Sequence, residues 1–322
     1  MGMIHVAVFS ICFGIVVGFE LNIRECGTND ITTNPGKISG GTEVTSIARW
    51  PWACSLGSLK GSYWMHRCGG SLITYRHLVT AAHCIDELLR DSQFQVRCGD
   101  LHLSNSTDDG TAQTREVVNH SYYKDYNLKV VNNDIAVINV GEEFNPTAYV
   151  RPICLTRDDT STTLITVGWG WDKKERFGQN LKQANQQMLE PKFCKDQTGM
   201  HKWIDLSGFG NDLFCAADPT GKQSGSCKGD SGGPIFSFNS RTNTYFLRGI
   251  VNGGIGCGKF STPDIYTSTT FSPIFEWILD VVEDDCVESS VGEILEINCA
   301  SYMLGNRLLR LSAPHVASTI DF

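Results

Sequence analysis

The segment Cys227-Lys228-Gly229-Asp230-Ser231-Gly232-Gly233-Pro234 sets one serine among glycines, which permit a sharp turn and a close approach of substrate. A serine hydroxyl is a weak nucleophile at neutral pH, so it needs an imidazole that takes its proton and a carboxylate that fixes the tautomer of the imidazole. Both stand upstream, in Thr80-Ala81-Ala82-His83-Cys84 and in Asn133-Asp134-Ile135-Ala136. Together the three segments predict acyl-transfer chemistry, with Ser231 as nucleophile, His83 as general base and then general acid, and Asp134 as the group that orients the histidine.

The three segments resemble those of chymotrypsin-like (trypsin-fold) serine peptidases in wording and in the chain order His, Asp, Ser. That order differs from the orders found in subtilisins and α/β-hydrolases. The resemblance implies an all-β fold of two antiparallel β-barrels with the active site in the cleft between them, a C-terminal helix and a short extension. It also implies protein or peptide substrates, an oxyanion hole made by the amides of Gly229 and Ser231, and no cofactor.

Composition agrees with such a fold. A chain of 322 residues with 41% hydrophobic content can bury a large core, and 32 glycines suit an all-β protein with tight turns. Short strands separated by Gly, Asn and Asp turns are predicted at Ser71-Leu72-Ile73, Phe94-Gln95-Val96, Ile135-Ala136-Val137-Ile138, Leu164-Ile165-Thr166-Val167 and Leu247-Arg248-Gly249-Ile250-Val251. An apolar stripe of Ile274, Trp277, Ile278 and Val281 predicts a helix over 271–282.

The chain divides into four predicted segments. Residues 1–18 carry no Lys, Arg, Asp or Glu and are predicted to be a secretory signal peptide, because their apolar run is shorter than a membrane span; a signal anchor is the alternative. Residues 19–37 are a predicted activation propeptide. Residues 38–282 form the predicted peptidase domain, with a crossover between the barrels near 145–155. Residues 283–322 form an acidic extension.

Charge is uneven along the chain. The extension holds seven acidic residues against two arginines, so −5 of the chain's formal charge of −8 belongs to it. The sequence has no basic stripe with interleaved aromatic residues, which excludes the usual pattern of nucleic-acid binding. We expect a secreted, extracellular monomer with no membrane span.

Activation by proteolysis is predicted from Ile38-Ser39-Gly40-Gly41, which resembles the mature amino terminus of the family. The resemblance implies that an activating protease cuts after Lys37 and that the new ammonium group of Ile38 pairs with the carboxylate of Asp230. A buried ion pair is stable only when both members are present, so cleavage would switch the zymogen on. The alternative is an ordinary surface loop around Lys37. Proteinaceous inhibitors are further expected partners.

The thirteen cysteines become an even twelve once Cys12 is removed with the predicted signal, and an even set in a secreted chain indicates disulfides. The resemblance implies four bridges, Cys26 with Cys154, Cys68 with Cys84, Cys194 with Cys215, and Cys227 with Cys257. For the other four cysteines, we hypothesise that Cys54 and Cys98 bridge across the first barrel and that Cys286 and Cys299 close the tail.

Primary specificity is predicted from two positions. By resemblance, the residue six before the nucleophile lies at the base of the primary pocket, where aspartate selects Arg or Lys; here it is Gly225. Asp264 falls on a later pocket strand where many relatives have glycine. Either Asp264 pairs with a basic substrate residue, or Ser226 holds it and the pocket is shortened for mid-sized apolar side chains. An unpaired buried carboxylate is costly, so it needs a partner or water.

The strand predicted to pair with substrate backbone reads Asn252-Gly253-Gly254 where the family has Ser-Trp-Gly. Backbone hydrogen bonds survive such a change, whereas loss of the tryptophan opens the neighbouring subsites. We therefore predict a broad or chymotrypsin/elastase-like preference with tolerance of basic residues, and substrate contacts at Gly225, Ser226, Asn252, Gly254 and Asp264.

Asn105 and Asn119 begin glycosylation sequons. Asp100, Asp108 and Asp109 lie where some relatives bind calcium, but their spacing fits a solvated acidic turn better, so no metal is predicted. Two other classes of function remain alternatives. A catalytically silent homologue that binds or regulates would usually lose a member of the triad, and an esterase would carry a Gly-x-Ser-x-Gly elbow.

Overall fold

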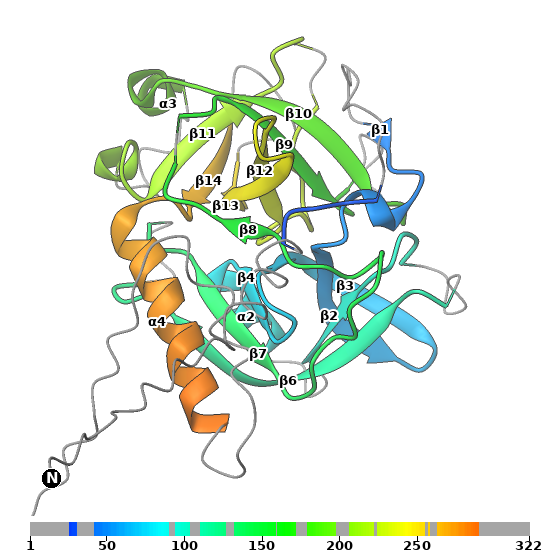
Figure 1. Ribbon diagram of the computed structural model, residues 1–322. Helices are drawn as coiled ribbons and strands as arrows, with labels where there is room; N and C mark the ends of the chain where they lie inside the picture. Colours follow the sequence, from blue (N-terminus) through cyan, green and yellow to red (C-terminus); the bar gives the residue numbers. More distant parts are fainter. Residues whose placement is uncertain are drawn as a thin grey trace, which may run out of the picture.

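The computed structural model describes residues 26–30, 42–89, 94–103, 110–126, 132–158, 160–171, 179–197, 206–221, 224–254, 257 and 263–289. Two β-barrels lie one above the other (Figure 1). The first closes in the order β2-β3-β4-β7-β6-β5, with every neighbouring pair antiparallel. Its strands are β2 (Ala53–Lys60), β3 (Tyr63–Leu72), β4 (His77–Thr80), β5 (Phe94–Cys98), β6 (Gln113–Tyr122) and β7 (Ala136–Val140).

The second barrel runs β10-β11-β14-β13-β12-β9 and closes through an antiparallel β9–β10 pair. Its strands are β9 (Thr163–Gly168), β10 (Lys182–Met188), β11 (Leu213–Ala217), β12 (Pro234–Asn239), β13 (Thr244–Gly253) and β14 (Asp264–Ser268). Two short strands lie outside the ring: β1 (Thr42–Glu43) pairs with β10, and β8 (Cys154–Leu155) pairs in parallel with β13. The predicted all-β fold of two antiparallel barrels is confirmed.

An aromatic cluster joins the barrels. Trp50 and Trp52, which are fully buried just before β2, pack on Phe236 of β12 with ring centroids 4.9 and 5.3 Å away. The indole N–H of Trp50 donates to Gln183 of β10 at 2.6 Å. Large aromatic rings bury much apolar area and add favourable edge contacts, so this cluster fixes the relative position of the two barrels.

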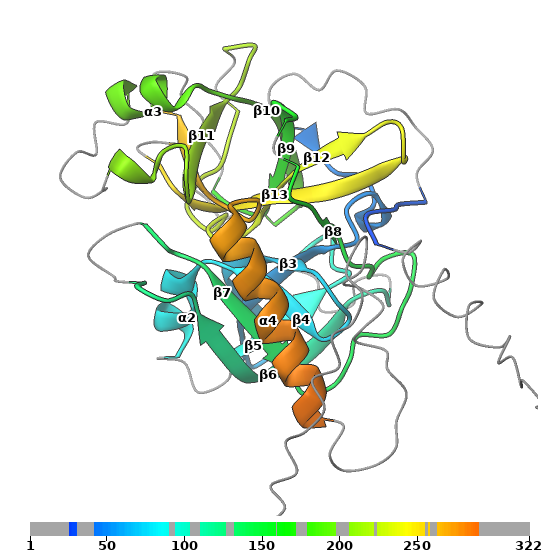
Figure 2. The ribbon, with the colours of Figure 1, turned by 60° about the vertical axis from the view of Figure 1, so that its left-hand side comes forward.

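In the part of the chain that the structure describes, helices are few and all but one are short. They are the 3-10 helices η1 (Ile47–Arg49) and η2 (Leu206–Gly208) and the α-helices α2 (Ala82–Leu88), α3 (Pro191–Gln197) and α4 (Ser272–Ser289). Helix α4 descends from the second barrel across the first (Figure 2). Among the described residues, no helix combines the length and apolar character that a bilayer crossing requires.

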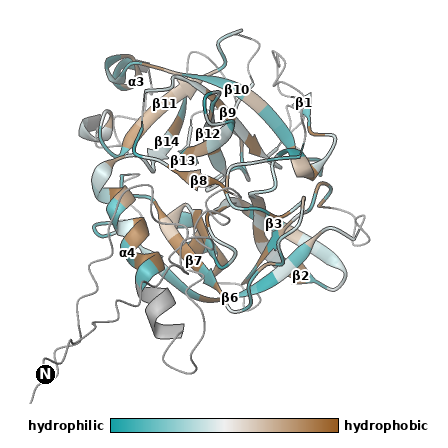
Figure 3. Cartoon of the chain, viewed as in Figure 1, coloured by the Kyte–Doolittle hydropathy of each residue, from teal (hydrophilic) through white to brown (hydrophobic). Residues whose placement is uncertain are grey.

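The stripe predicted for the C-terminal helix is only partly buried. Ile274, Ile278 and Val282 are buried in the core, and Trp277 meets Tyr123 edge to face at 5.3 Å. Hydrophobic and hydrophilic segments alternate along α4 (Figure 3). The helix continues past its predicted end at Val282 to Ser289, because residues 283–289 contain neither glycine nor proline to stop it.

Among the described residues, five disulfides tie these elements together. They are Cys26–Cys154, Cys54–Cys98, Cys68–Cys84, Cys194–Cys215 and Cys227–Cys257. Cys54 on β2 and Cys98 on β5 are register partners in neighbouring strands, which explains why they meet. Cys299 and the side chain of Cys286 lie outside the described residues.

Candidate active site

Helix α2 carries His83 in its first turn, directly after β4. The ring Nδ1 of His83 lies 2.6 Å from Oδ2 of Asp134, and its backbone N–H donates to Oδ1 of Asp134 at 2.9 Å. Asp134, 3% exposed, lies two residues before the start of β7. Both carboxylate oxygens are therefore bound to the same histidine, which fixes the ring orientation and leaves Nε2 on the opposite side.

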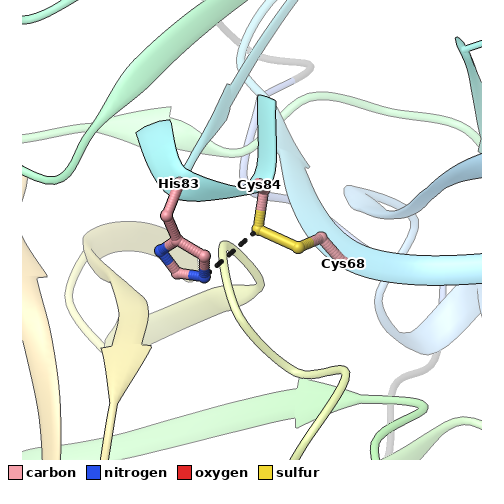
Figure 4. A group of neighbouring side chains, drawn as sticks. All are labelled: Cys68, His83 and Cys84. Carbon is pink, nitrogen blue, oxygen red and sulfur yellow. Dashed lines mark hydrogen bonds between the residues drawn. A yellow bond between two sulfur atoms is a disulfide. The ribbon is translucent and has the colours of Figure 1, made fainter. Parts of the chain in front are cut away.

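The surroundings of the His83–Asp134 pair favour the protonated form of the imidazole. Burial disfavours the cation of His83, but the charge of Asp134 and its hydrogen bond outweigh burial, with help from Glu87 and Asp86. The pKa of His83 is therefore raised above its ordinary value. The imidazole lies beside the Cys68–Cys84 bridge, with Nε2 3.7 Å from Cys84 Sγ (Figure 4). Because these sulfurs are joined to each other, they are not thiolate ligands for a metal.

The loop around Ser231 is bound to strands of both barrels, β3 of the first and β13 of the second. The carbonyl of Ser231 accepts from Gly69 N at 2.8 Å, and Gly232 N donates to Val251 O at 2.7 Å. Gly232 has a φ of 75°, and a Cβ there would overlap Thr80 and lie 2.8 Å from the amide of Ala81. Only glycine fits, and the fit brings the serine loop against the residues that lead into the histidine helix.

Two amides beside Ser231 lack a protein acceptor in the described part of the chain. Asp230 N donates to Cys227 O at 3.0 Å and Gly233 N to Asp230 O at 2.9 Å, but the N–H groups of Gly229 and Ser231 make no such bond. Gly229 has a φ of 95°, a conformation that glycine adopts readily. Two uncommitted donors next to a hydroxyl can stabilise an oxyanion.

A buried histidine that the sequence reading missed holds this loop. Nε2 of His66 lies 2.9 Å from Gly229 O, and Nδ1 lies 2.7 Å from the hydroxyl of Ser55. Burial lowers the pKa of His66 to about 4, so the ring is neutral, with Nε2–H donating to Gly229 and Nδ1 accepting from Ser55. Nothing in its local sequence marked His66, because its partner is 163 positions away.

The side chain of Asp230 is buried and bound to backbone amides from two separate places in the chain. Its carboxylate accepts from Gly170 N at 2.7 Å and Cys227 N at 2.8 Å. Gly168 and Gly170 leave room for it, since a Cβ on either would overlap its oxygens. Burial raises the pKa of Asp230 to about 6, although both amides and Lys182 oppose this. Lys37 and Ile38, its predicted activation partners, lie outside the described residues.

Three of the predicted primary-pocket residues come together. Asp264, 3% exposed on β14, accepts from Ser226 N at 2.7 Å, and a Cβ on Gly254 would lie 3.2 Å from its Oδ1. Burial raises the pKa of Asp264 to about 7; bonds from Ser226 and Tyr266 oppose the shift, and the charge of Asp230 adds to it. Gly225, next to Ser226 in the chain, is partly exposed.

Asn252 has a different setting from the other predicted substrate contacts. It is buried on β13, and its side-chain amide donates to Thr267 Oγ1 at 3.0 Å. Its side chain therefore faces the interior, so the predicted contact with substrate would have to be made by its backbone. Of the two predicted sequon asparagines, Asn119 is exposed on β6, and Asn105 lies outside the described residues.

The trypsin family model matches residues 38–278. The chain belongs to the trypsin family. It is 32% identical over 256 residues to clotting factor C of Tachypleus tridentatus, an alignment that covers 74% of this chain and 24% of that protein. The serine proteinase stubble of Drosophila melanogaster is 32% identical over 266 residues, 80% of this chain and 32% of the relative. The proclotting enzyme of Tachypleus tridentatus is 28% identical over 267 residues, 79% of this chain and 68% of the relative. The chain thus spans about a quarter of clotting factor C.

Membership of the trypsin family agrees with the resemblance on which the sequence prediction drew. The matched range begins at Ile38, where the mature amino terminus was predicted, and ends inside α4. The structure brings His83 and Asp134 together and sets the Ser231 loop against the segment before α2. The three residues predicted for the chemistry therefore lie in neighbouring segments of the structure.

Proposed function

We propose that the chain is a secreted serine endopeptidase that hydrolyses peptide bonds through an acyl-enzyme intermediate. The observation that carries the proposal is the His83–Asp134 pair, bound at 2.6 and 2.9 Å, next to a serine loop with two uncommitted amides. Homology to serine proteases supports the same activity.

The proposed reaction has two halves, acylation of Ser231 and hydrolysis of the acyl-enzyme, and the same groups act in both. Ser231 Oγ attacks the scissile carbonyl while His83 accepts its proton, and the amides of Gly229 and Ser231 bind the developing oxyanion. His83 then protonates the leaving amine, and water hydrolyses the acyl-enzyme by the same route in reverse. Asp134 keeps the imidazole in the tautomer with Nδ1 protonated and stabilises the imidazolium.

The proposed enzyme is made as a zymogen. The carboxylate of Asp230 is buried and its pKa is raised. The two hydrogen bonds that it accepts from backbone amides therefore do not fully compensate its negative charge. A new ammonium group on Ile38, formed by an activating protease that cuts after Lys37, would supply that compensation. The relatives include a proclotting enzyme, whose name denotes a precursor. Extracellular location is supported by the five disulfides.

The proposed primary specificity is broad, with apolar side chains accepted and basic ones tolerated. Asp264 is held by Ser226 N, which favours the reading in which the carboxylate is retained by the pocket wall. Its pKa of about 7 means that both its neutral and its charged form are populated near neutral pH. The neutral form suits apolar side chains, and the charged form suits Lys or Arg.

Hydrolysis of a peptide library tests the proposal. The full chain is cleaved after Lys37, the Ile38 amino terminus is verified by sequencing, and Ser231→Ala is prepared in parallel. Turnover by the wild type alone, at bonds after apolar and some basic residues, is expected. Absence of turnover with a verified Ile38 terminus would point to a silent homologue that binds or regulates.

A further inference from the structure

Side chains of the second barrel hold the backbone of residues 133–134, which belong to the first barrel. Asn133 N donates to Oδ2 of Asp212 at 3.0 Å, and the carbonyl of Asp134 accepts from the hydroxyl of Thr267 at 3.1 Å. Asp212 directly precedes β11, and Thr267 lies on β14. The residue that orients His83 is thus anchored on both sides by the other barrel.

Asn133 adopts a conformation that needs support. Its φ is 58°, in the left-handed region that side chains other than glycine visit rarely, although asparagine tolerates it better than most. Such conformations persist where surrounding contacts over-determine them. Here the amide of Asn133 is bound to Asp212, and its carbonyl accepts from Ile135 N at 2.9 Å.

Asp212 is built firmly into the second barrel. It is 7% exposed, and its own carbonyl accepts from Ser268 N at 2.7 Å. Gly208 lies against it, so that a Cβ on Gly208 would come within 2.8 Å of Oδ1 of Asp212. The Asp212 carboxylate is therefore a fixed acceptor rather than a solvated surface charge.

We propose that Asp212 is a positioning residue for catalysis, which holds Asn133 in the left-handed turn that aims Asp134 at His83. The inference rests on the proposed function, since it gives Asp212 a task in the same reaction. Asp134 binds His83 through two short hydrogen bonds, so a rotation of the peptide before it would misalign both. Thr267, which receives the amide of Asn252, secures the far side of Asp134.

Four variants separate positioning from charge and from general stability. Asp212→Ala removes the acceptor, whereas Asp212→Asn removes the charge and keeps an oxygen that accepts a hydrogen bond. Adding Asn133→Gly to Asp212→Ala makes the left-handed turn free of strain. Asp196→Ala on the exposed surface of α3 removes a charge from the same disulfide loop and is the matched control. Each full chain is cleaved after Lys37, and turnover is counted per serine labelled by a phosphonate.

The expected effect falls on kcat. Asp212→Ala should lower kcat about tenfold and leave KM within about twofold, because the lost contact acts on the chemical step. The acid limb of its kcat/KM profile should move to lower pH, since His83 loses part of the support of Asp134. Asp212→Asn and Asp196→Ala should stay within about threefold of the wild type, and Asn133→Gly should recover most of the kcat lost in Asp212→Ala.

Three results would overturn the inference and leave the peptidase proposal standing: an unchanged kcat in Asp212→Ala, an equal loss in Asp212→Asn, or no recovery with Asn133→Gly. If Asp212→Ala does not fold, as judged by thermal unfolding, Asn133→Ala decides the question. That change raises the strain of the turn and should lower kcat about threefold with KM unchanged, while an unchanged kcat overturns the inference. Absence of turnover in the wild type would instead refute the proposed function.

Discussion

Nε2 of His66 lies 2.9 Å from the carbonyl oxygen of Gly229, so a neutral histidine of the first barrel holds the loop that presents Ser231. The same residue, Gly229, carries one of the two backbone N–H groups that have no acceptor in the described part of the chain. Because His66 is also bound to Ser55, and Ser55 accepts from the indole of Trp64 at 2.7 Å, the support is a buried chain of hydrogen bonds.

Removal of this support should impair catalysis. His66→Ala leaves the Gly229 carbonyl without its donor and lets the loop relax, so kcat/KM should fall roughly tenfold or more. His66→Gln restores an N–H donor of similar reach and should recover part of the loss. Initial rates per active site measure the effect, and equal rates in the wild type and His66→Ala would contradict the assigned role.

His66 should also make stability depend on pH in the acid range. Its folded pKa of about 4 lies below the value of about 6.5 for an exposed histidine, so its contribution is complete above pH 6.5 and is lost as the pH falls toward 4. The pKa difference corresponds to roughly 3 kcal/mol. Because Asp230 titrates in the same window with the opposite sign, the measurement compares denaturant unfolding of the wild type and His66→Gln.

In that comparison, the stability advantage of the wild type over His66→Gln should shrink between pH 6.5 and pH 4. A difference that stays constant across the window would show that the imidazole has the same pKa in the folded and unfolded chains, and would contradict the assignment of a buried neutral ring.

The primary pocket should change its preference near neutral pH. Asp264 has a pKa of about 7, so the pocket is neutral below that pH and anionic above it. The ratio of kcat/KM for substrates with arginine to that for substrates with leucine should rise by about tenfold from pH 6 to pH 8. Asp264→Asn should abolish this rise, and a ratio that follows the same curve in the variant would assign it to another group.

The Cys54–Cys98 bridge should contribute stability without touching the chemistry. It closes a sequence separation of 44 residues between β2 and β5, and removal of such a bridge typically costs about 2–4 kcal/mol. The double variant Cys54→Ala/Cys98→Ala should therefore unfold at lower denaturant and keep its kcat per labelled serine. Unchanged stability, or a lost kcat with unchanged stability, would contradict this expectation.

The family resemblance carried by three short segments was enough to predict the fold and to propose the groups for the chemistry. The Ser231 segment is recognisable because close packing demands glycine at positions such as Gly232, and those demands are written in adjacent residues. The supporting residues were not predictable in the same way. His66 meets its partner 163 positions away and Asp212 meets Asn133 79 positions away, and neither position carries a local signature.

The end of α4 and the side chain of Asn252 show a second limit. The predicted helix ended where the apolar stripe ended, but a helix continues until a stop signal or the loss of packing ends it. Asn252 was predicted to bind substrate through its backbone, and the contacts of its side chain were not predicted. That side chain donates to Thr267, whose hydroxyl donates to the carbonyl of Asp134. A strand pattern and a family resemblance place a residue on a strand. They do not determine what a polar side chain on that strand will contact.

Covalent labelling of the serine tests the central claim most directly. A fluorophosphonate reacts with a serine whose hydroxyl is activated by a neighbouring base, and mass spectrometry of the digested protein locates the adduct. In the full chain cleaved after Lys37, we predict one adduct on Ser231, lost in Ser231→Ala and strongly slowed in His83→Ala. Absence of an adduct, or equal labelling in His83→Ala, would contradict the claim that His83 activates Ser231.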